Sequence, residues 1–511
     1  IKRETKALGY AVTTVGGDEI DRAQTVSPVA ALQGKVAGVE INQGDGGMFG
    51  STKIQIRGAS TLSSNNQPIF VVDGVILDNA SSNSGDADWD SNINDYGNEL
   101  KNLNPDDFAS VSVLKGAAAT ALYGSRGLNG AVVITTKSGS KTRGLGIHFS
   151  QTLGIDHVYK SPDLQNEYLE GAFPGEVLYG DDYDKTGNRW SDNMTAYTRN
   201  SNKDYSMISQ HDSNNAASGW AWGPNISWAK GKTFEQYDGT MGSMNIYKDN
   251  YKDAYQSGVN TNTNVSLQGG NDRTTFYASA SYKYNKGTVP NNTFSRFSFL
   301  GKASQKIGNN VKLDFSINFA QSQPRNAANN IGEYFATGTF PREYDVNKYK
   351  HLYKGPHGGI ASSTYGDPYA SVPGKGLWWD IYENNYEQTE TSVRPIVNLS
   401  WNATKWLQFT AGGNLNYYYI DSEGKDPGSG YANQGGSYAI TSQSVKQENA
   451  YAAANANYQI NDDWEVHGFV RGEYFNQSGM YHSESTNGGL IVPNQYFITN
   501  SVNQASFAGY K

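Results

Sequence analysis

The stretch Leu103–Gly139 reads LNPDDFASVSVLKGAAATALYGSRGLNGAVVITTKSG, and it decides the fold of the first part of the chain. Val111–Leu114 is a short β-rich run, and Ala117–Leu122 is a run of strong helix formers. Gly124 stands where a left-handed residue ends a helix, and the β-branched run Ala131–Thr136 is typical of a buried strand. The order predicts strand, short helix, glycine-rich loop and strand, without a catalytic pattern.

Three further blocks precede this stretch: LQGKVAGVEI at Leu32–Ile41, IQIRGASTL at Ile54–Leu62 and PIFVVDGVIL at Pro68–Leu77. Four blocks in this order are far more specific than a single glycine motif. Together they resemble the plug domain of TonB-dependent outer-membrane transporters, and specifically the SusC-like family that imports large nutrients. The chain departs from the family pattern at Gly116, where an acidic residue is expected. The resemblance implies an α+β plug domain at residues 1–139 that fills the lumen of a barrel.

Composition sets limits on the class of protein. The net charge of −8 gives no basic surface for nucleic acid, and the absence of cysteine excludes disulfides and thiolate metal sites. No stretch approaches the roughly 20 apolar residues that a membrane-spanning helix needs. Strands of an outer-membrane barrel escape that test, because only alternate residues face lipid.

From residue 145 onward, apolar and polar residues alternate. In Val311–Phe319 the odd positions are apolar and the even ones polar, and Phe276–Tyr284 and Leu407–Leu415 repeat the pattern. Strands of about ten residues with one apolar face are typical of a barrel with lipid outside and water inside. Short turn signals alternate with long links, as periplasmic turns alternate with extracellular loops.

The sequence therefore predicts an antiparallel membrane β-barrel behind an N-terminal α+β plug domain. Residues 145–511 are assigned to the barrel, with long extracellular loops at about 158–260, 323–388, 419–443 and 477–501. Roughly ten strands can be counted, whereas the family's plugged barrel has 22. We therefore expect an N-terminal part of a longer protein, with the TonB box before Ile1 and the remaining strands after Lys511.

The resemblance also implies roles for plug residues. Arg57 and Arg126 are expected to face the barrel wall and to pair with wall carboxylates, which would hold the plug in place. A surface arginine without a lasting contact is the alternative. The further residues assigned to plug structure or gating are Gly58, Asp73, Gly74, Tyr123, Gly124 and Gly130.

Aromatic residues are abundant in the predicted loops. Rings beside Asn, Asp and Gln suit sugars, which offer apolar faces ringed by hydroxyls. The alternative is that these rings pack the loops together or against a partner. The candidate substrate contacts are Trp220, Trp222, Trp228, Trp378, Trp379 and Tyr369.

An acidic stretch holds the weak candidates for a cation site, Asp86, Asp88 and Asp90. A structural calcium ion is the alternative there, but Ser91 and Gly97 stand where the EF-hand pattern needs its glycine and glutamate. A solvated acidic loop fits better, so no metal or other cofactor is predicted. No zinc-protease or phosphate-loop motif is present, which argues against an enzyme.

Given the resemblance, the predicted function is TonB-dependent import of an oligosaccharide across the outer membrane of a Gram-negative bacterium. The implied partners are a SusD-like lipoprotein cap, the TonB-ExbB-ExbD complex and outer-membrane lipid, with two importer–lipoprotein pairs forming a dimer. An oligopeptide is the second choice of cargo and a small metal chelate the third. A surface adhesin or structural β protein is the alternative of another class, and a hydrolase the last.

Overall fold

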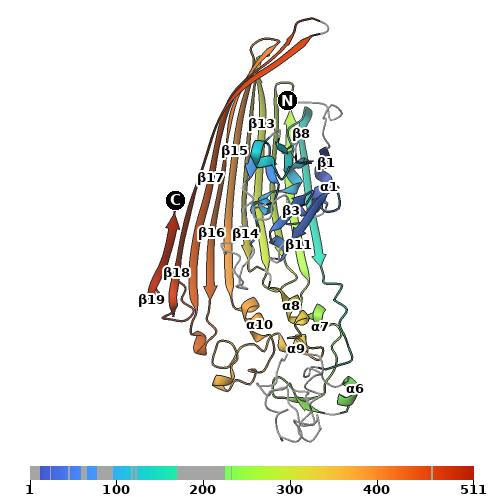
Figure 1. The fold of residues 1–511 in the computed structure, drawn as a ribbon, viewed down its shortest axis with the longest axis vertical. Coiled ribbons are helices and arrows are strands. Elements are labelled where there is room, and N and C mark those ends of the chain that lie inside the picture. The colour runs from blue at the N-terminus through green and yellow to red at the C-terminus, as the bar shows by residue number, and fades with distance from the viewer. Residues whose placement is uncertain are drawn as a thin grey trace.

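The computed structural model places the plug domain against the concave side of one large antiparallel sheet (Figure 1). It describes residues 12–22, 25–43, 47–58, 66–77, 96–116, 119–120, 123–169, 225–231, 233–327, 329–461 and 464–511. The short turns of the sheet lie at one end of the molecule, and the helices of the long loops lie at the other.

The plug domain is an α+β unit, as predicted. Its main sheet has the order β1 (Val12–Gly16), β6 (Phe108–Leu114), β7 (Ala131–Thr136), β4 (Ile69–Val72) and β5 (Val75–Leu77), and β2 (Val39–Gln43) pairs with β3 (Thr52–Ile56). Among the strands that the structure describes in the plug, only β4 and β7 pair in parallel. The helical segments are short: α1 (Gly17–Asp21), η2 (Ala30–Leu32), η3 (Gly47–Phe49), η4 (Glu99–Asn102), η5 (Pro105–Asp107) and η6 (Gly124–Gly127). One apolar core joins both sheets, because alternate residues of β3, β4, β6 and β7 point into it.

The turn between β4 and β5 explains the Asp-Gly pair in its sequence. Val72 pairs with Val75, so Asp73 and Gly74 alone form the turn, with φ of 49° and 90°. Two-residue hairpin turns with positive φ match the twist of the flanking strands and favour Asp-Gly. This turn therefore projects the Asp73 side chain beyond the plug sheet.

The large sheet, called the wall below, contains ten strands. Their bounds are β8 (Thr142–Asp156), β11 (Gly258–Gly270), β12 (Thr274–Lys286), β13 (Thr293–Ile307), β14 (Val311–Arg325), β15 (Asn385–Asn402), β16 (Leu407–Asp426), β17 (Ser437–Gln459), β18 (Glu465–Leu490) and β19 (Ser501–Tyr510). Each strand pairs with the wall strand that precedes it in sequence, and β8 pairs with β11. The wall is thus an antiparallel meander, which is the order of a barrel.

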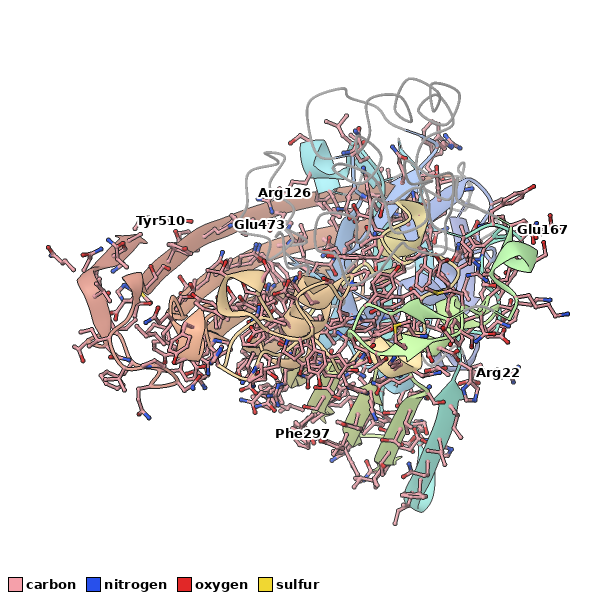
Figure 2. All side chains as sticks on the ribbon, turned by 90° about the horizontal axis from the view of Figure 1, so that it is seen from below. Arg22, Arg126, Glu167, Phe297, Glu473 and Tyr510 are labelled. Atoms are coloured by element: carbon pink, nitrogen blue, oxygen red, sulfur yellow. The ribbon has the colours of Figure 1, made fainter. Side chains whose placement is uncertain are left out.

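The wall has polar residues inside and apolar residues outside. On β13, Arg296 and Ser298 are at most 1% exposed, whereas Phe297 and Phe299 are 45% and 37% exposed. Phe297 lies on the side of the wall away from the plug (Figure 2). A water-soluble sheet would show the opposite pattern, so the wall fits a membrane barrel filled by a plug.

Two loop predictions and the strand length are wrong. β16 and β17 run through most of the range 419–443, leaving residues 427–436 as the link, and β18 reaches Leu490 within the range 477–501. Several wall strands have 15 to 26 residues rather than about ten. These strand ends carry polar residues on both faces, so their sequence lacks the alternation by which a strand is identified. They are strands nevertheless, because they pair with the neighbouring strands.

The two longest links carry short elements. Residues 157–257 include α6 (Ile226–Ala229), β9 (Phe234–Glu235), β10 (Met241–Gly242) and α7 (Asn250–Asp253). Residues 326–384 include α8 (Ile331–Ala336), α9 (Val346–Tyr349), η8 (Ser363–Tyr365) and α10 (Lys375–Tyr382), and η9 (Tyr431–Asn433) follows β16. No helix in the described ranges is long and apolar enough to cross a membrane.

Candidate functional site

A polar segment of the plug, Asn98–Asp107, runs along the inner face of the wall. It contains η4 and η5, and η5 begins at Pro105 after Asn104, whose Oδ1 accepts from the Asp106 amide (3.3 Å). Seven of its polar residues are at most 6% exposed: Asn98, Glu99, Lys101, Asn102, Asn104, Asp106 and Asp107. We call this segment and the wall residues that contact it the polar seam.

An ion pair between Lys101 and Glu390 is at the centre of the polar seam. The Lys101 Nζ lies 2.5 Å from a Glu390 oxygen, and the two side chains are 1% and 0% exposed. Glu390 also accepts hydrogen bonds from Asn102 Nδ2 (2.9 Å), Gln388 Nε2 (2.6 Å) and the Tyr418 hydroxyl (2.6 Å). Such a set of donors compensates the loss of water around a buried carboxylate.

A second ion pair, of opposite polarity, adjoins the first. Arg394 of β15 lies 3.6 Å from Glu99 of the plug, and both side chains are at most 2% exposed. Arg296 of β13 donates to the carbonyls of Lys101 (2.8 Å) and Leu103 (2.5 Å). The wall therefore presents a carboxylate to a plug lysine and a guanidinium to a plug glutamate.

The end of the polar seam contacts β11 and β12. Asn262 donates to Asp106 (2.7 Å), and Asp107 accepts from Tyr277 (3.2 Å) and from Ser279. Burial raises the pKa of the Asp107 carboxyl, although hydrogen bonds from Ser279, Asn104 and Tyr277 oppose that rise. The seam thus spans wall strands from β11 to β16.

Nearer the short-turn end, Asp73 joins the plug to the wall beside a cavity. Its carboxylate lies 2.9 Å from Lys302 of β13 and accepts from the Thr136 amide (3.0 Å) and hydroxyl (2.6 Å). The cavity, about 390 Å³, separates β7 from β12–β15 and has polar lining groups that include Ser138, Ser316 and Asn398. The Asp73–Lys302 contact is therefore a bridge across a polar gap.

The two plug arginines singled out from the sequence make different contacts. Arg57 is exposed at φ 62° before Gly58 (φ 88°). Arg126 lies with its guanidinium carbon 4.4 Å from the ring centre of Phe475 on β18. In the described ranges, no ion pair joins either arginine to a wall carboxylate, and their role in holding the plug stays a prediction. Lys101, which sequence reasoning passed over, pairs with the wall instead.

The other plug predictions concern turns and packing. Gly124 begins η6 with φ 63° after the partly exposed Tyr123. Gly130 has φ 97°, and a side chain there would meet Ile56 and the Leu114 carbonyl. These positions fit structural roles at the plug core, whereas a part in gating stays a prediction.

The long loops share an aromatic core at the end of the barrel opposite the short turns. We call it the loop core, and its buried members are Tyr237, Ala254, Val289, Ile331, Phe335, Phe340, Tyr344, Val346, Tyr349, Val372, Leu377, Trp378 and Ile381. Phe340 stacks on Tyr344 at 4.6 Å and on Trp378 at 5.8 Å between ring centres. The core joins residues from both long links, so these loops fold as one body.

The loop core decides the outcome for several predicted substrate contacts. Trp378 and Trp379 are 0% and 2% exposed, so both side chains are packed among the loop residues. Tyr369 is partly buried against the same core. The burial of these two tryptophans favours the packing alternative, and a substrate contact at any of the three residues stays a prediction.

Other predictions lie outside what the structure describes. Trp220 and Trp222 fall in the range 170–224, and Asp86, Asp88 and Asp90 fall in the range 78–95. For Trp228 only its place in α6 is described. Among the described residues no cluster of three or more His, Asp or Glu side chains could hold a metal ion.

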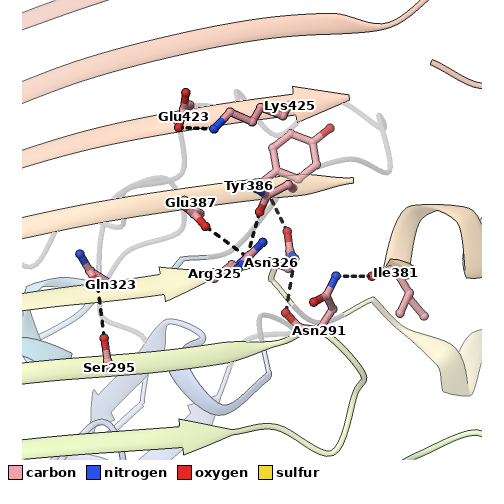
Figure 3. A network of polar contacts seen from close by, with 11 residues as sticks. Asn291, Ser295, Gln323, Arg325, Asn326, Ile381, Tyr386, Glu387, Glu423 and Lys425 are labelled. Carbon is pink, nitrogen blue, oxygen red and sulfur yellow. Dashed lines mark hydrogen bonds and ion pairs between the residues drawn. The ribbon is translucent and has the colours of Figure 1, made fainter. Parts of the chain in front are cut away.

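Hydrogen bonds of asparagine and arginine connect the loop core to its surroundings. The Arg342 guanidinium donates to Asn166 (2.8 Å), to the Lys248 carbonyl (2.9 Å) and to Asn250, which joins the two long links. Asn326 exchanges hydrogen bonds with the Tyr386 backbone (2.8 Å), and Asn291 donates to the Ile381 carbonyl at the end of α10 (3.1 Å; Figure 3). The loop core is thereby fixed to β14 and β15.

Known proteins share these features. Residues 4–131 match the family described as the TonB-dependent receptor plug domain. The TonB-dependent receptor SusC of Bacteroides thetaiotaomicron is 32% identical over 195 residues, which are 38% of this chain and 17% of SusC. The TonB-dependent receptor P26 of Formosa agariphila is 24% identical over 334 residues, 65% of this chain and 27% of that protein. The chain thus matches about a quarter or less of these relatives' length.

A solved structure extends the likeness in fold to nearly the whole chain. The RagAB peptide importer in its closed-closed state matches with a TM-score of 0.69 and 20% identity, over 98% of this chain and 52% of that chain. At this identity the match shows the fold alone. With the plug match and the SusC similarity, it supports one reading of the architecture: residues 4–131 match a TonB-dependent receptor plug domain, and the plug with its ten-stranded antiparallel wall resembles the SusC-like TonB-dependent receptors of the outer membrane.

Proposed function

We propose that this receptor imports a large nutrient, most readily an oligosaccharide, through the barrel when the plug is displaced. The polar seam carries the proposal. Lys101, Glu390 and Arg394 are buried now, but each can be hydrated once plug and wall separate. An interface between apolar surfaces would resist such opening, because separation would expose it to water.

The partners follow from the family. A TonB-ExbB-ExbD complex would pull the plug from the periplasm, and a SusD-like lipoprotein would close the outer face above the loop core. A dimer of such pairs is the proposed assembly in outer-membrane lipid. The name of the TonB-dependent receptor SusC supports the dependence on TonB, whereas the lipoprotein and the dimer rest on the resemblance to the SusC-like family.

Two cargo classes compete. Similarity to SusC-like receptors favours an oligosaccharide, while the fold is shared with a protein named a peptide importer. Both cargoes are polar and need the same displacement of the plug. No bond chemistry is part of this proposal.

A disulfide across the polar seam tests the gate directly. Ser322 donates to Asn102 across the seam (2.5 Å), and the chain has no native cysteine. In the full-length receptor with its partners, the pair Asn102→Cys and Ser322→Cys should abolish uptake of fluorophore-labelled gluco-, manno- and xylo-oligosaccharides and casein peptides. Uptake should return when the disulfide is reduced.

The matched control joins two wall strands and leaves the seam free. Thr441 and Ser483 face each other on β17 and β18, with hydroxyls 3.1 Å apart, so Thr441→Cys with Ser483→Cys should leave uptake intact. Uptake that continues with an oxidised seam disulfide would refute the gate. Binding of probes without any uptake that depends on the proton gradient would favour an adhesin.

A further inference from the structure

Three rings from two loops form an exposed group apart from the loop core. His357 and Tyr365 belong to the link before β15, and Tyr431 belongs to the link after β16. The ring centres are 5.4 Å apart for His357–Tyr431, 5.4 Å for Tyr365–Tyr431 and 6.2 Å for His357–Tyr365. The three side chains are 40% to 44% exposed. We call these residues the ring group.

Backbone contacts hold the two loops of the ring group together. The Ala432 amide donates to the His357 carbonyl (2.7 Å), and the Ile360 amide donates to the Ser429 carbonyl (3.0 Å). Gly359, at φ 78°, lies against the Gly430 carbonyl, where a side chain would collide. Ala432 itself has a φ of 49°, which a non-glycine residue adopts at some cost. The rings are therefore set side by side by the backbone.

Two side chains beside the ring group each have an oxygen atom that can accept a further hydrogen bond. Asp367 is 5% exposed, and its Oδ2 accepts from the Ser362 amide (2.9 Å). Its Oδ1 has no hydrogen-bond partner among the described residues and lies 4.0 Å from His357 Nε2. The buried Oδ1 of Asn433, two residues after Tyr431, likewise has none. A ligand for this place should offer apolar faces and hydroxyl donors together.

We propose that the ring group is a carbohydrate-binding site, which takes one or two pyranose rings of an oligosaccharide. The C–H faces of the sugar would stack on Tyr365 and Tyr431, and its hydroxyls would donate to Asp367 or Asn433. This proposal rests on the proposed import function and names its cargo class.

Size and strand pairing favour a sugar over other ligands. Three rings cover far less than the ~800 Å² that each partner of a stable protein–protein interface buries. Extended peptides commonly bind by adding a strand to a free sheet edge, but β16 and β17, which flank the Tyr431 loop, each have partners on both sides. A sugar needs neither a large surface nor an edge.

The test uses the purified full-length receptor in detergent. A microarray of defined oligosaccharides would identify bound glycans, and titration calorimetry with the tightest one would measure affinity. Tyr365→Ala and Tyr431→Ala should each weaken binding by about three- to tenfold, since each removes one of the two rings on which the sugar stacks. Tyr365→Phe should keep most of the affinity.

The control is Tyr159→Ala, which removes a ring that is 86% exposed and lies outside the ring group, and it should leave affinity unchanged. Unaltered hydrogen exchange in the loop core would confirm that each variant folds. Glycan affinity that survives loss of both Tyr365 and Tyr431 would overturn the site, as would uptake of peptides with no glycan bound. In both cases import itself could continue, whereas a receptor without any energy-dependent uptake would refute the proposed function first.

Discussion

The polar seam and the loop core are both buried, but the seam consists of charged and polar side chains and the loop core of aromatic and aliphatic ones. At the seam, Lys101, Glu390 and Arg394 are at most 2% exposed and meet through charges and hydrogen bonds. In the loop core, Phe340, Tyr344 and Trp378 meet through stacked rings. The seam joins two parts that the proposed function separates, whereas the loop core joins segments that stay together.

The contrast teaches how burial relates to reversibility. Separated charged groups recover most of their lost interactions from water, whereas separated rings expose apolar surface. A buried ion pair is also weak evidence for high stability, because its desolvation cost offsets much of its attraction. The seam is therefore suited to specific seating of the plug and the loop core to permanent assembly.

The largest expected effect comes from Lys101→Met. It would leave Glu390 buried without its cation, a change that typically costs ~3–5 kcal/mol. Hydrogen exchange of the β6 and β7 amides in the full-length receptor should accelerate strongly, while the loop core should keep its protection. Lys53→Met alters an exposed lysine of β3 and is the control. Equal protection in both variants would mean that the seam does not seat the plug.

Tyr344→Phe should perturb the loop core alone. The Tyr344 hydroxyl accepts from Trp378 Nε1 (3.2 Å) and donates to the Pro373 carbonyl (3.2 Å), so its loss leaves two buried groups unpaired. The expected cost is ~1–3 kcal/mol. Exchange should rise at α10 and stay unchanged at β6, with Tyr159→Phe as the exposed control. If exchange rose as much at β6 of the plug as at α10, the polar seam and the loop core would not be independent.

The seam should respond to pH through Asp107. Burial raises the folded-state pKa of the Asp107 carboxyl. The stability that its protonated form gives to the folded state is therefore fully present below the unfolded-state pKa, and it is lost as pH rises through the folded-state pKa. Between these two values the seating of the plug should weaken with pH, by up to about 1.4 kcal/mol per unit. Plug exchange measured from pH 4 upward should show this slope, and Asp107→Asn should flatten it. A wild-type profile already flat would contradict the assignment.

The smallest effect is expected where the wall meets the loop core. Arg325 and Glu387 form a 3.3 Å pair there, with side chains 42% and 47% exposed (Figure 3). Such exposed pairs contribute ~0–1 kcal/mol. Glu387→Gln should leave exchange at α10 and β6 nearly unchanged, and a loss as large as that of Tyr344→Phe would show that this contact fixes the loops.

The alternation of apolar and polar residues, together with the residue types found in turns, made much of the fold predictable. The alternation in Phe276–Tyr284 identified the outer face of β12, and the Asp73-Gly74 pair marks a two-residue turn. The ends of β17 and β18 carry polar residues on both faces, and they were predicted to be loops. Their backbone pairing with neighbouring strands cannot be inferred from the sequence of one strand.

The site was less predictable, because contacts between distant segments decide it. Lys101 and Glu390 are 289 positions apart along the chain, and nothing local distinguishes either from a solvated charge. Trp378 was predicted to contact substrate because an aromatic ring in a polar loop suits a sugar. Its burial depends on Tyr237 and Phe340, which come from other parts of the loops. A signal was available in β15, where Glu390, Ser392 and Arg394 alternate along one face and are buried, while Val397 and Leu399 lie exposed on the other face.

The opposite polarity of the two seam ion pairs has a consequence for folding. Plug and wall must find one alignment among many that fit in shape. A shift that placed Glu99 opposite Glu390 would bring two carboxylates together away from water, which costs several kcal/mol. The order of charges along Glu99–Lys101 and Glu390–Arg394 therefore makes the observed alignment of plug and wall more favourable than a shifted one.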